Sequence, residues 1–391
     1  GGYATLWPMR FTTTAVECGG DVHGMAYEVG ADMVDMEFIQ HVPSSVDPRI
    51  THINVTITNF PGWRPQIREH GRFINSEGED FLAKYDGIRA WNTTRDVRSF
   101  GIYSEVRAGR GSPHGGCYMD LTSVPKDILI YEFDKFQGGK SVPKSYRVRC
   151  ERVGFDLSEE PMEVGAKSHF TGGGVQTGLD MMTNVEGLYA AGETQGGVHG
   201  ANRLGGNALT HVAAFGRVAG REAAAYAANA SAPKVTDAKV DLEHKRVFGW
   251  TDGDGKGESP IKIRQKMQET MWEKVGIIRN ETDLKSAIDW LAEAKNELLP
   301  QAKMKSKALP FNWEWATAIT LPRQLDTCML VAHAALERKE SRGNHHRDDY
   351  LAMDNSNWLK NTYLRRGDGG DVELRTEPLK VTTVDPEEVI D

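Results

Sequence analysis

One stretch of the sequence, residues 169–209, limits the possible folds more than any other part of the chain. Glycine-rich turns in it surround His169, Glu193, His199 and Arg203, and a run of small residues that favours a helix begins after Gly206. Because glycine has no Cβ, main chain of this composition can press against a flat ligand. A helix that begins there directs its unpaired N–H groups and the positive end of its dipole at that ligand. The stretch therefore predicts a cofactor site that accepts negative charge.

The length, net charge and cysteine content are typical of a globular protein. At 391 residues the chain is too long for a single compact core, so we expect two or three domains. A net charge of −8 argues against a nucleic-acid binder and favours a weakly acidic enzyme. The four cysteines have no metal-binding or redox spacing, which indicates free thiols in a reducing compartment. No apolar run reaches the length of a membrane span and no signal peptide is visible, so we expect a cytoplasmic location.

The stretch 169–209 resembles the second FAD-binding and active-site segment of the succinate dehydrogenase/fumarate reductase flavoprotein family, which includes L-aspartate oxidase. The motifs HFTGGG, AAGET and HGANRLGG carry the resemblance, and ESRGNHHRDD extends it towards the C-terminus. The resemblance implies FAD as cofactor, and a reduced flavin, with negative charge at N1 and O2, suits the helix N-terminus. It also implies an α/β fold in which an α+β capping domain interrupts the FAD-binding domain and a helical domain follows.

This fold implies five segments. Residues 1–40 are expected to be a remnant of the FAD-binding domain, 41–165 the capping domain that closes over the substrate, and 166–230 the second part of the FAD-binding domain. The polar residues 231–258 read as a linker, and 259–391 as a C-terminal helical domain with a terminal hairpin. The chain has neither GxGxxG after a first strand nor the acidic residue that binds ribose, so we expect the N-terminal dinucleotide-binding half to be absent.

Residue periodicity predicts several individual elements. Alternating apolar residues predict a strand over 51–59, and DILIYEF predicts another over 127–133. Residues 93–111 predict an amphipathic helix that ends at glycine. Apolar residues spaced at 3.6 predict helices between 259 and about 339, and GDGGDVELR at 367–375 predicts a hairpin.

Three basic residues are assigned to the substrate by the resemblance. Arg203, in HGANRLGG, matches the arginine that binds the substrate carboxylate, and a planar guanidinium can hold a carboxylate through two hydrogen bonds. His169, before three glycines, matches a histidine that also contacts that carboxylate. Arg95, in TTRDV, aligns with the arginine that the family uses as proton donor. The structural alternatives are an arginine that pairs with an acidic neighbour for Arg203 and a surface pair with Asp96 for Arg95.

Five residues are assigned to FAD in the same way. Asp21, in GGDVHGMAYEVGADMVDMEF, falls where the family's aspartate contacts the nucleotide, and its alternative role is a helix N-cap. Glu193, in AAGET, matches the glutamate that hydrogen-bonds the ribityl chain. Asn207, Ala208 and Leu209 open the predicted helix, and in the family the backbone N–H groups at the last two positions face the flavin pyrimidine edge.

The sequence departs from the family at two places. The family reads QYHPTG after the MEF strand, whereas this chain has Val42 where that histidine stands, and the adjacent His41 points to the opposite face of a strand. The family's Thr-Glu-Gly-x-Arg-Gly-Glu-Gly stretch is also missing, and Trp63 and Arg64 stand roughly at its threonine and relay glutamate. Since a large indole would reshape a dicarboxylate pocket, we expect a substrate other than fumarate or succinate.

Three functions stay open. The first is an FAD-dependent oxidoreductase that moves a hydride between the flavin and a carbon–carbon unit next to a carboxylate. The second is an amino-acid oxidase like L-aspartate oxidase, and the third is a catalytically inactive flavoprotein-like assembly subunit. The resemblance implies a small carboxylate substrate and an iron–sulfur partner subunit, with the protein in the cytoplasm or at the inner face of the membrane.

Other polar residues are expected to be structural. His199 has no role in the family that we can assign and is expected to pack in the core. His345, His346, Asp348 and Asp349 are expected to form a hydrogen-bonding cluster at the surface, and we predict no metal site.

Overall fold

The computed structural model describes residues 2–53, 65–131, 146–252 and 256–382. The chain divides into two compact units, and each is built from separate stretches of sequence. Unit 1 contains residues 1–6, 17–39 and 171–391, and unit 2 contains residues 7–16 and 40–170.

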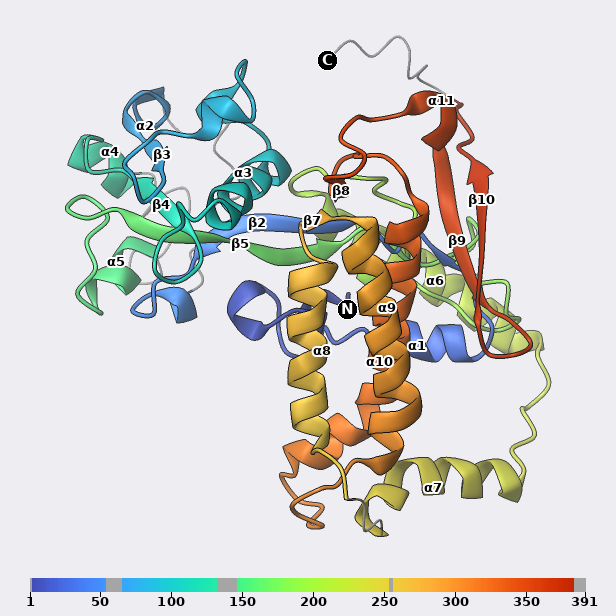
Figure 1. Cartoon of the computed structure of the whole chain (residues 1–391). Coiled ribbons are helices and arrows are strands. Elements are labelled where there is room, and N and C mark those ends of the chain that lie inside the picture. The colour runs from blue at the N-terminus through green and yellow to red at the C-terminus, as the bar shows by residue number, and fades with distance from the viewer. Residues whose placement is uncertain (1, 54–64, 132–145, 253–255, 383–391) are drawn as a thin grey trace. The chain divides into compact units, whose positions relative to one another are not determined.

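A four-stranded sheet organises unit 2 (Figure 1). Its strand order is β2 (Ile39–Ser45), β5 (Met162–Thr171), β4 (Cys117–Asp120) and β3 (Arg72–Ile74). Strand β4 runs antiparallel to both β3 and β5. All seven residues of β2 are buried, so both of its faces are covered. The described residues of this unit also form short 3-10 helices: η2 (Met9–Phe11), η3 (Thr51–Ile53), η5 (Leu82–Lys84) and η6 (Ala90–Asn92).

Helices complete the hydrophobic core of unit 2. They are α2 (Pro65–His70), α3 (Arg95–Arg107), α4 (Lys126–Tyr131) and α5 (Tyr146–Glu151). Helix α3 confirms the amphipathic helix predicted over 93–111, with Ile102 fully buried and Gly109 just beyond its end at a φ of 79°. The core joins aromatic residues such as Phe73 and Phe81 with aliphatic residues from the sheet.

Two strand predictions in this unit need correction. Residues 127–131 lie in helix α4, because Pro125 starts the turn and its carbonyl accepts from the N–H groups of Ile128 and Leu129. A short apolar run does not by itself distinguish a strand from a buried helix. Thr51–Ile53 form η3, since the carbonyl of Asp47 accepts from the N–H of Thr51, and the rest of the predicted strand lies outside the described residues.

Three long helices of unit 1 lie side by side (Figure 1): α8 (Pro260–Lys274), α9 (Glu281–Glu293) and α10 (Trp313–Glu337). Each begins after a capping side chain, which fixes its first turn. Ser259, Asn280 and Asn312 accept from N–H groups three residues further on. These helices confirm the predicted helical segment. The turns η10 (Ala294–Leu298, a π-helix) and η11 (Leu299–Gln301) follow α9.

The sheet of unit 1 draws its strands from distant parts of the chain. Its order is β10 (Val372–Pro378), β9 (Lys360–Arg366), β1 (Met33–Val34) and β6 (Gly174–Val175), with antiparallel pairing throughout. Met33 lies opposite Val175 on one side and Leu364 on the other. Strands β9 and β10 confirm the terminal hairpin. The remaining short elements are η1 (Ala4–Leu6), η9 (Gly192–Thr194), β7 (Ile278–Arg279), β8 (His346–Arg347) and α11 (Asn355–Trp358).

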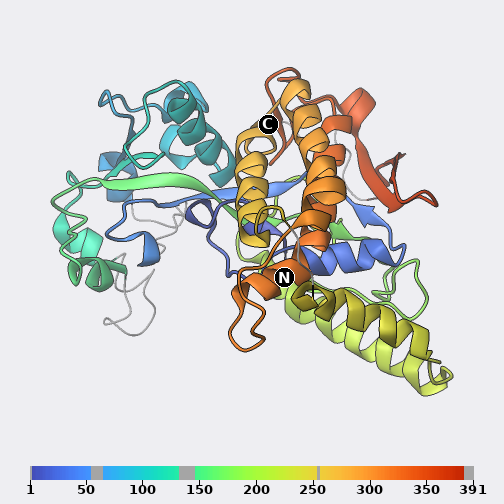
Figure 2. The ribbon, with the colours of Figure 1, turned by 60° about the horizontal axis from the view of Figure 1, so that its bottom comes forward.

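Helix α1 (Asp21–Glu28) packs closely on α10 through Gly24, where a Cβ would collide with the main chain of Arg323. Helices α6 (Asn207–Asn229) and α7 (Asp237–Asp252) lie at the periphery of unit 1 (Figure 2). The segment 231–258, read as a linker, therefore contains a helix of 16 residues. Its polar composition reflects exposure on nearly all sides, because none of its described side chains is buried.

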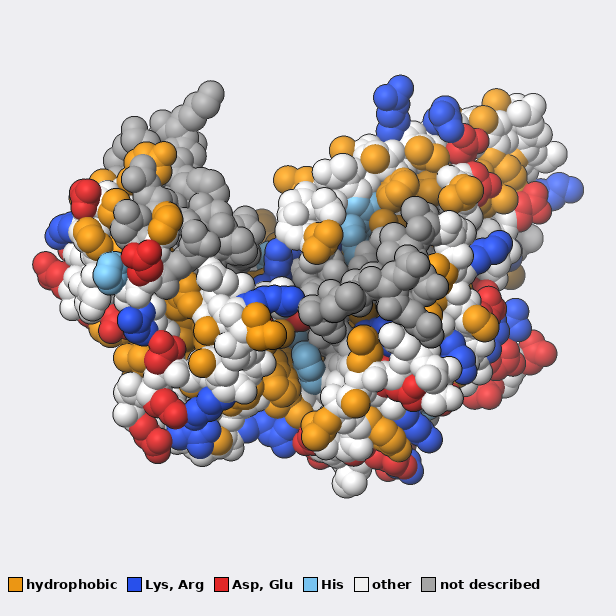
Figure 3. Space-filling model, turned by 90° about the horizontal axis from the view of Figure 1, so that it is seen from above, with side chains coloured by type: hydrophobic (Ala, Val, Ile, Leu, Met, Phe, Trp, Pro, Cys, Tyr) orange, Lys and Arg blue, Asp and Glu red, His pale blue; other side chains and the backbone are white. Residues whose placement is uncertain are grey.

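The surface is mixed in charge. On the face seen in Figure 3, acidic and basic side chains are interspersed, which fits the modest net charge of −8. None of the described helices combines the length and the apolar character that a bilayer crossing requires.

Candidate functional site

The N-terminus of α6 is open. Gly206 precedes it with a φ of 86°, in the left-handed region that favours glycine, and no described side chain caps the helix. Asn207, Ala208 and Leu209 form the first turn, whose N–H groups have no partners within a helix. A Cβ placed on Gly206 would meet no heavy atom within 4 Å. This end of α6 can therefore accept an anionic ring edge or a phosphate.

Glu193 presents a partly buried carboxylate from η9, next to α6. Its Oε1 accepts from the backbone N–H of Thr171 at 3.0 Å and from the hydroxyl of Thr171 at 3.4 Å. Gly2 packs directly over this group, since a Cβ there would collide with the carboxylate. Burial raises the pKa of Glu193, while these bonds and the charge of Arg203 act to lower it. Such a carboxylate is suited to hold a ligand hydroxyl group.

Arg203 is buried, with 6% of its surface exposed, in the loop before α6. Its Nη1 donates to the carbonyl of Leu204 at 3.3 Å. Its charge opposes the burial that raises the pKa of Glu193, and it adds to the burial that lowers the pKa of His199. The fixed positive charge of a guanidinium in this position can attract a carboxylate.

His199 belongs to a chain of hydrogen bonds that the sequence did not reveal. Its Nε2 lies 3.0 Å from Nδ1 of His211, and Nε2 of His211 lies 3.0 Å from Oε1 of Gln195. Burial, then the neighbouring charges of His211 and Arg203, lower the pKa of His199 to about 4. His199 is therefore neutral at pH 7. His211 and Gln195 are 16 positions apart in the sequence, and the fold brings them together.

His169 lies on β5 of unit 2, half-buried. Its Nδ1 is 2.6 Å from the hydroxyl of Thr13, which fixes the orientation of the ring. The segment around Thr13 is held against β5 by further contacts, for example from the N–H of Thr13 to the carbonyl of Ser168 at 2.9 Å. A histidine held in this way can present its ring to a ligand with little loss of side-chain entropy.

Arg95 is the first residue of α3, also in unit 2. Its Nη1 donates to Oε1 of Gln40 in β2 at 3.4 Å, and the described contacts contain no ion pair with Asp96, the structural alternative considered for Arg95. Burial lowers the pKa of Arg95. Val42 lies fully buried in the same strand as Gln40, at the position of the missing histidine. His41 packs edge-on against Trp7, with their ring centroids 6.3 Å apart.

The predicted residues thus divide between the units. Asp21, Glu193, Arg203 and residues 207–209 belong to unit 1, and His169 and Arg95 belong to unit 2. Asp21 is the first residue of α1 rather than its N-cap, which is Gly20 at a φ of 77°. Its carboxylate there complements the helix dipole.

The glycine run at 172–174 has a different role from the one its composition indicates. A Cβ on Gly173 would collide with the carbonyl of Asp35, and one on Gly174 would collide with the carbonyl of Thr194. These glycines therefore allow the chain to pack against its own main chain, whereas Gly206 borders open space.

The surface cluster predicted around His345 is only partly at the surface: Asp348 and Asp349 are exposed and His346 is half-buried, but His345 lies in the interior. His345 is fully buried, and its Nδ1 accepts from Nη1 of Arg279 at 2.7 Å while its Nε2 donates to the carbonyl of Arg338. Arg347 holds Asp349 through two bonds of 2.7 Å. The buried arginines need these partners, so the residues that looked like metal ligands hold the fold together. In the described part of the chain no group of such side chains could bind a metal.

Two family models match the chain. The model for an FAD binding domain matches residues 2–209, and the model for the C-terminal part of fumarate reductase flavoproteins matches residues 264–389. One subunit of the CoM/CoB fumarate reductase of Methanothermobacter marburgensis is 34% identical over 368 residues, which cover 94% of this chain. The fumarate reductase flavoprotein subunit of Escherichia coli is 31% identical and covers 96%. The chain spans 62% of the length of each of these relatives.

Solved structures agree with these matches. FrdA of the E. coli quinol fumarate reductase, as a single-residue variant, superimposes with a TM-score of 0.83 at 30% identity, covering 99% of this chain and 66% of its own. Sdh1 of Mycobacterium smegmatis in complex with UQ1 gives a TM-score of 0.80 at 32% identity, covering 99% of this chain and 62% of its own.

The fold and the matches define a class of FAD-dependent oxidoreductases. Within it, the chain belongs to the fumarate reductase/succinate dehydrogenase flavoprotein family, and the cofactor of that family is FAD. The described residues fit this cofactor, because the open N-terminus of α6 offers N–H donors and Glu193 offers a carboxylate acceptor next to it.

Proposed function

We propose that the protein is an FAD-dependent oxidoreductase that transfers a hydride between the flavin and a carbon–carbon bond next to a carboxylate. The arrangement of buried Arg203, Glu193 and the open N-terminus of α6 within unit 1 supports this proposal most directly. When bound, FAD supplies the hydride or takes it up. Unit 2 has the role of the capping domain in this proposal.

Each basic residue has one task in the reaction. Arg203 binds the substrate carboxylate and stabilises the negative charge that develops on it in the transition state. His169, oriented by Thr13, donates a hydrogen bond to the same kind of oxygen. Arg95, whose pKa is lowered by burial, exchanges the proton at the carbon next to the carboxylate. Asp21, Glu193 and residues 207–209 bind FAD.

We propose a substrate that is neither fumarate nor succinate. Buried Val42 provides no hydrogen bond where the family has a histidine, so one carboxylate contact of a dicarboxylate is lost. Trp63 and Arg64 lie outside the described residues. The same observation supports a second candidate, a catalytically inactive assembly subunit, because loss of a substrate ligand is also what an inactive homologue would show.

A flavin assay tests both candidates. The protein from its whole reading frame is loaded with FAD, and the flavin absorbance is followed with a panel of enoates, saturated acids and amino acids. We expect one carboxylate class to oxidise or reduce the flavin, and Arg203→Gln to lower this rate at least 100-fold, in line with the loss of a transition-state donor. Arg221→Gln is the control, since Arg221 lies on the exposed surface of α6 and pairs only with Glu222 among the described residues. If no acid in the panel changes the flavin spectrum, the inactive assembly subunit is the better interpretation. If only amino acids are turned over, the protein is an oxidase like L-aspartate oxidase.

We propose further that an iron–sulfur subunit exchanges electrons with the flavin, as the family resemblance implies. The protein would then act in the cytoplasm or at the inner face of a membrane. Co-purification of a tagged chain with a protein that carries iron and acid-labile sulfide would support the partner, and a flavoprotein that purifies alone and accepts electrons directly from a soluble donor would oppose it.

A further inference from the structure

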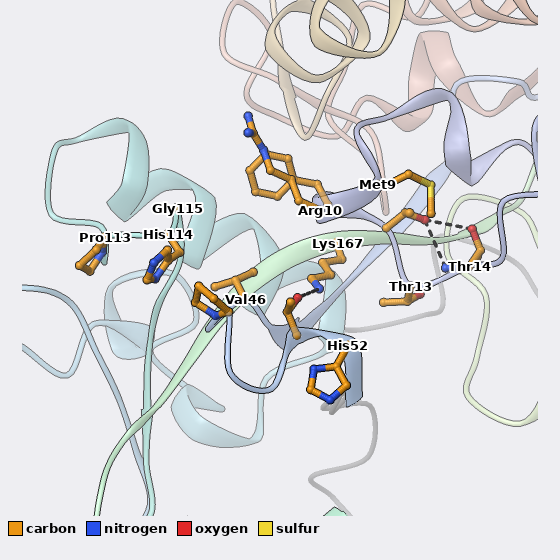
Figure 4. Close-up of a pocket in the computed structure, with 14 residues that line it drawn as sticks. Met9, Arg10, Thr13, Thr14, Val46, His52, Pro113, His114, Gly115 and Lys167 are labelled. Atoms are coloured by element: carbon orange, nitrogen blue, oxygen red, sulfur yellow. Dashed lines mark hydrogen bonds between the residues drawn. The ribbon is translucent and has the colours of Figure 1, made fainter. Parts of the chain in front are cut away.

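Unit 2 contains a cavity of about 900 Å³, and none of the residues assigned to the reaction lines it (Figure 4). Its wall is made by residues 9–14, by the turn after β2, by the loop at 113–115 and by Lys167 of β5. The volume is within the range of small-molecule sites. None of the described residues that line it is Asp or Glu, whereas Arg10, His52, His114 and Lys167 are basic. The cavity is therefore biased towards anions.

Among the residues that line the cavity, Lys167 is unusual because it is a buried lysine. Only 2% of its surface is exposed, and its Nζ donates to the hydroxyl of Thr51 at 3.1 Å (Figure 4). An ammonium group has three donors, and the described residues supply this single neutral acceptor. Burial of a charge without an opposite charge is costly, so the protein keeps a destabilised cation beside an open volume. Burial lowers the pKa of Lys167 to about 8, which leaves it largely charged at neutral pH.

The other basic residues differ in how far they are already neutralised. His114 is balanced by Glu163, whose Oε2 lies 2.6 Å from its Nδ1. Arg10 is exposed and stacks on the ring of Phe11 at 4.9 Å, without an ion pair in the described part of the chain. Exposed Arg10 can thus add a second positive charge to the wall that contains buried Lys167.

We propose that this cavity binds an oxyanion of a small molecule, a carboxylate, sulfonate or phosphate group, with Lys167 as the principal partner. The hydroxyl of Thr51 fixes the ammonium from one side and leaves its other N–H groups to the ligand. Thr12, Thr13 and Thr14 contribute further polar groups to the wall.

The cavity also extends to the neighbourhood of His169. Thr13, which lines the cavity, holds Nδ1 of His169 at 2.6 Å. We therefore assign the bound oxyanion to a second acidic group of the substrate, distinct from the carboxylate at the reacting bond. This assignment rests on the proposed function, whereas anion binding by Lys167 does not.

The test of anion binding needs no flavin and no turnover. Sodium sulfate is titrated into the protein by calorimetry at pH 7, with sodium chloride at matched ionic strength as the reference. We expect Lys167→Met to weaken sulfate binding at least tenfold and Lys126→Met to leave it unchanged, because Lys126 is exposed and pairs with Asp156 outside the cavity. Absence of sulfate binding to the wild type at millimolar concentration, or equal binding by Lys167→Met, would overturn the proposal.

A second measurement avoids any variant that fails to fold. Lysines of the wild-type protein are acetylated with and without sulfate, and the modified peptides are quantified by mass spectrometry. Sulfate should protect Lys167 and leave Lys126 unaffected. Equal modification of Lys167 in both samples, when its peptide is labelled, contradicts a sulfate ion bound to its ammonium group.

The substrate assignment is tested in the FAD-loaded protein. Lys167→Met should raise KM at least tenfold for an active substrate with a second acidic group, with kcat changed much less, and should not raise KM for the matching monoacid. Equal effects on both acids would overturn the assignment. If no acid is turned over but sulfate still binds through Lys167, the proposed function fails and the anion site stands.

Discussion

Nε of Arg338 lies 2.6 Å from Oε1 of Glu37, so a hydrogen-bonded ion pair joins two residues that are 301 positions apart in the sequence. Both side chains are buried, with at most 1% of their surface exposed. Arg338 also donates to Glu340 at 3.0 Å and to the carbonyl of Lys360 at 2.8 Å. The guanidinium of Arg338 thus links the segment after β1, which contains Glu37, to the start of β9 at Lys360.

Removal of this guanidinium should destabilise unit 1 strongly. Arg338→Met leaves the buried carboxylate of Glu37 without its ion-pair partner, whereas Glu340 keeps its bonds to Arg342, and the expected loss in unfolding free energy is about 3–5 kcal/mol. Arg365→Met is the matched control, because Arg365 and Glu373 form a pair in which each side chain is about half exposed, and the expected loss is below about 1 kcal/mol. Urea unfolding followed by fluorescence measures both. Equal midpoints for the two variants would show that the buried pair does not hold the unit together.

Two glycines should respond oppositely to alanine. Gly173→Ala places a Cβ against the carbonyl of Asp35, so we expect a loss of more than about 2 kcal/mol from the displaced main chain. Gly216→Ala lies within α6, where a Cβ meets no atom within 4 Å, and should increase stability by about 0.5–1 kcal/mol through helix propensity. Thermal unfolding of both variants tests this, and a stable Gly173→Ala would refute the close packing.

Stability should fall when the pH is lowered from about 6.5 to 4. The pKa of His199 is lowered to about 4 in the folded protein, from an ordinary value of 6.5. Between these values the unfolded chain binds more protons than the folded one, so stability rises with pH. His199→Gln should reduce the slope of unfolding free energy against pH in this window. His211 is coupled to His199 and its pKa is also lowered, so His211→Gln should reduce the slope as well, and slopes equal to the wild type would contradict this.

Sulfate binding to the cavity of unit 2 should weaken above pH 8. Lys167 has a pKa of about 8, lowered by burial, and loses its charge there, whereas an ordinary lysine keeps it to about 10.5. His52, His114 and Arg10 also line the cavity, and guanidinium groups in general keep their charge in this pH range. Calorimetry between pH 7 and 9.5 measures the change. Affinity that stays constant to pH 9.5 would assign the binding to Arg10 instead.

The sequence predicts a helix or hairpin well where residues close together in the sequence determine it. The helix after Gly206, the helix over 93–111 and the hairpin at 367–375 follow from glycine positions and apolar spacing, and the family motifs identify the cofactor. Helix α4 is missed because its apolar run of four residues, 128–131, is too short to show a period, and α7 because an exposed helix needs no apolar face.

What the sequence leaves out depends on contacts between distant residues. The chain of His199, His211 and Gln195 forms only when α6 lies against the preceding loop. The burial of Lys167 and its bond to Thr51 depend on a residue 116 positions away. Likewise, the glycines at 172–174 look like a ligand surface until the structure shows the carbonyl of Asp35 against them.

The two units are built from alternating stretches of the chain, and this alternation affects how the protein folds during synthesis. The chain passes between the units four times, and β1 of unit 1 needs β9, more than 300 residues later, as its pairing partner. Unit 2 is complete once residue 170 has left the ribosome, so it can fold while the rest is still being made. Unit 1 has to wait until β9 has been synthesised, and the long loop that must close first makes its assembly the slow step. During that interval residues 1–6 and 17–39 of unit 1 are exposed to solvent, and this is when the nascent protein most needs a chaperone.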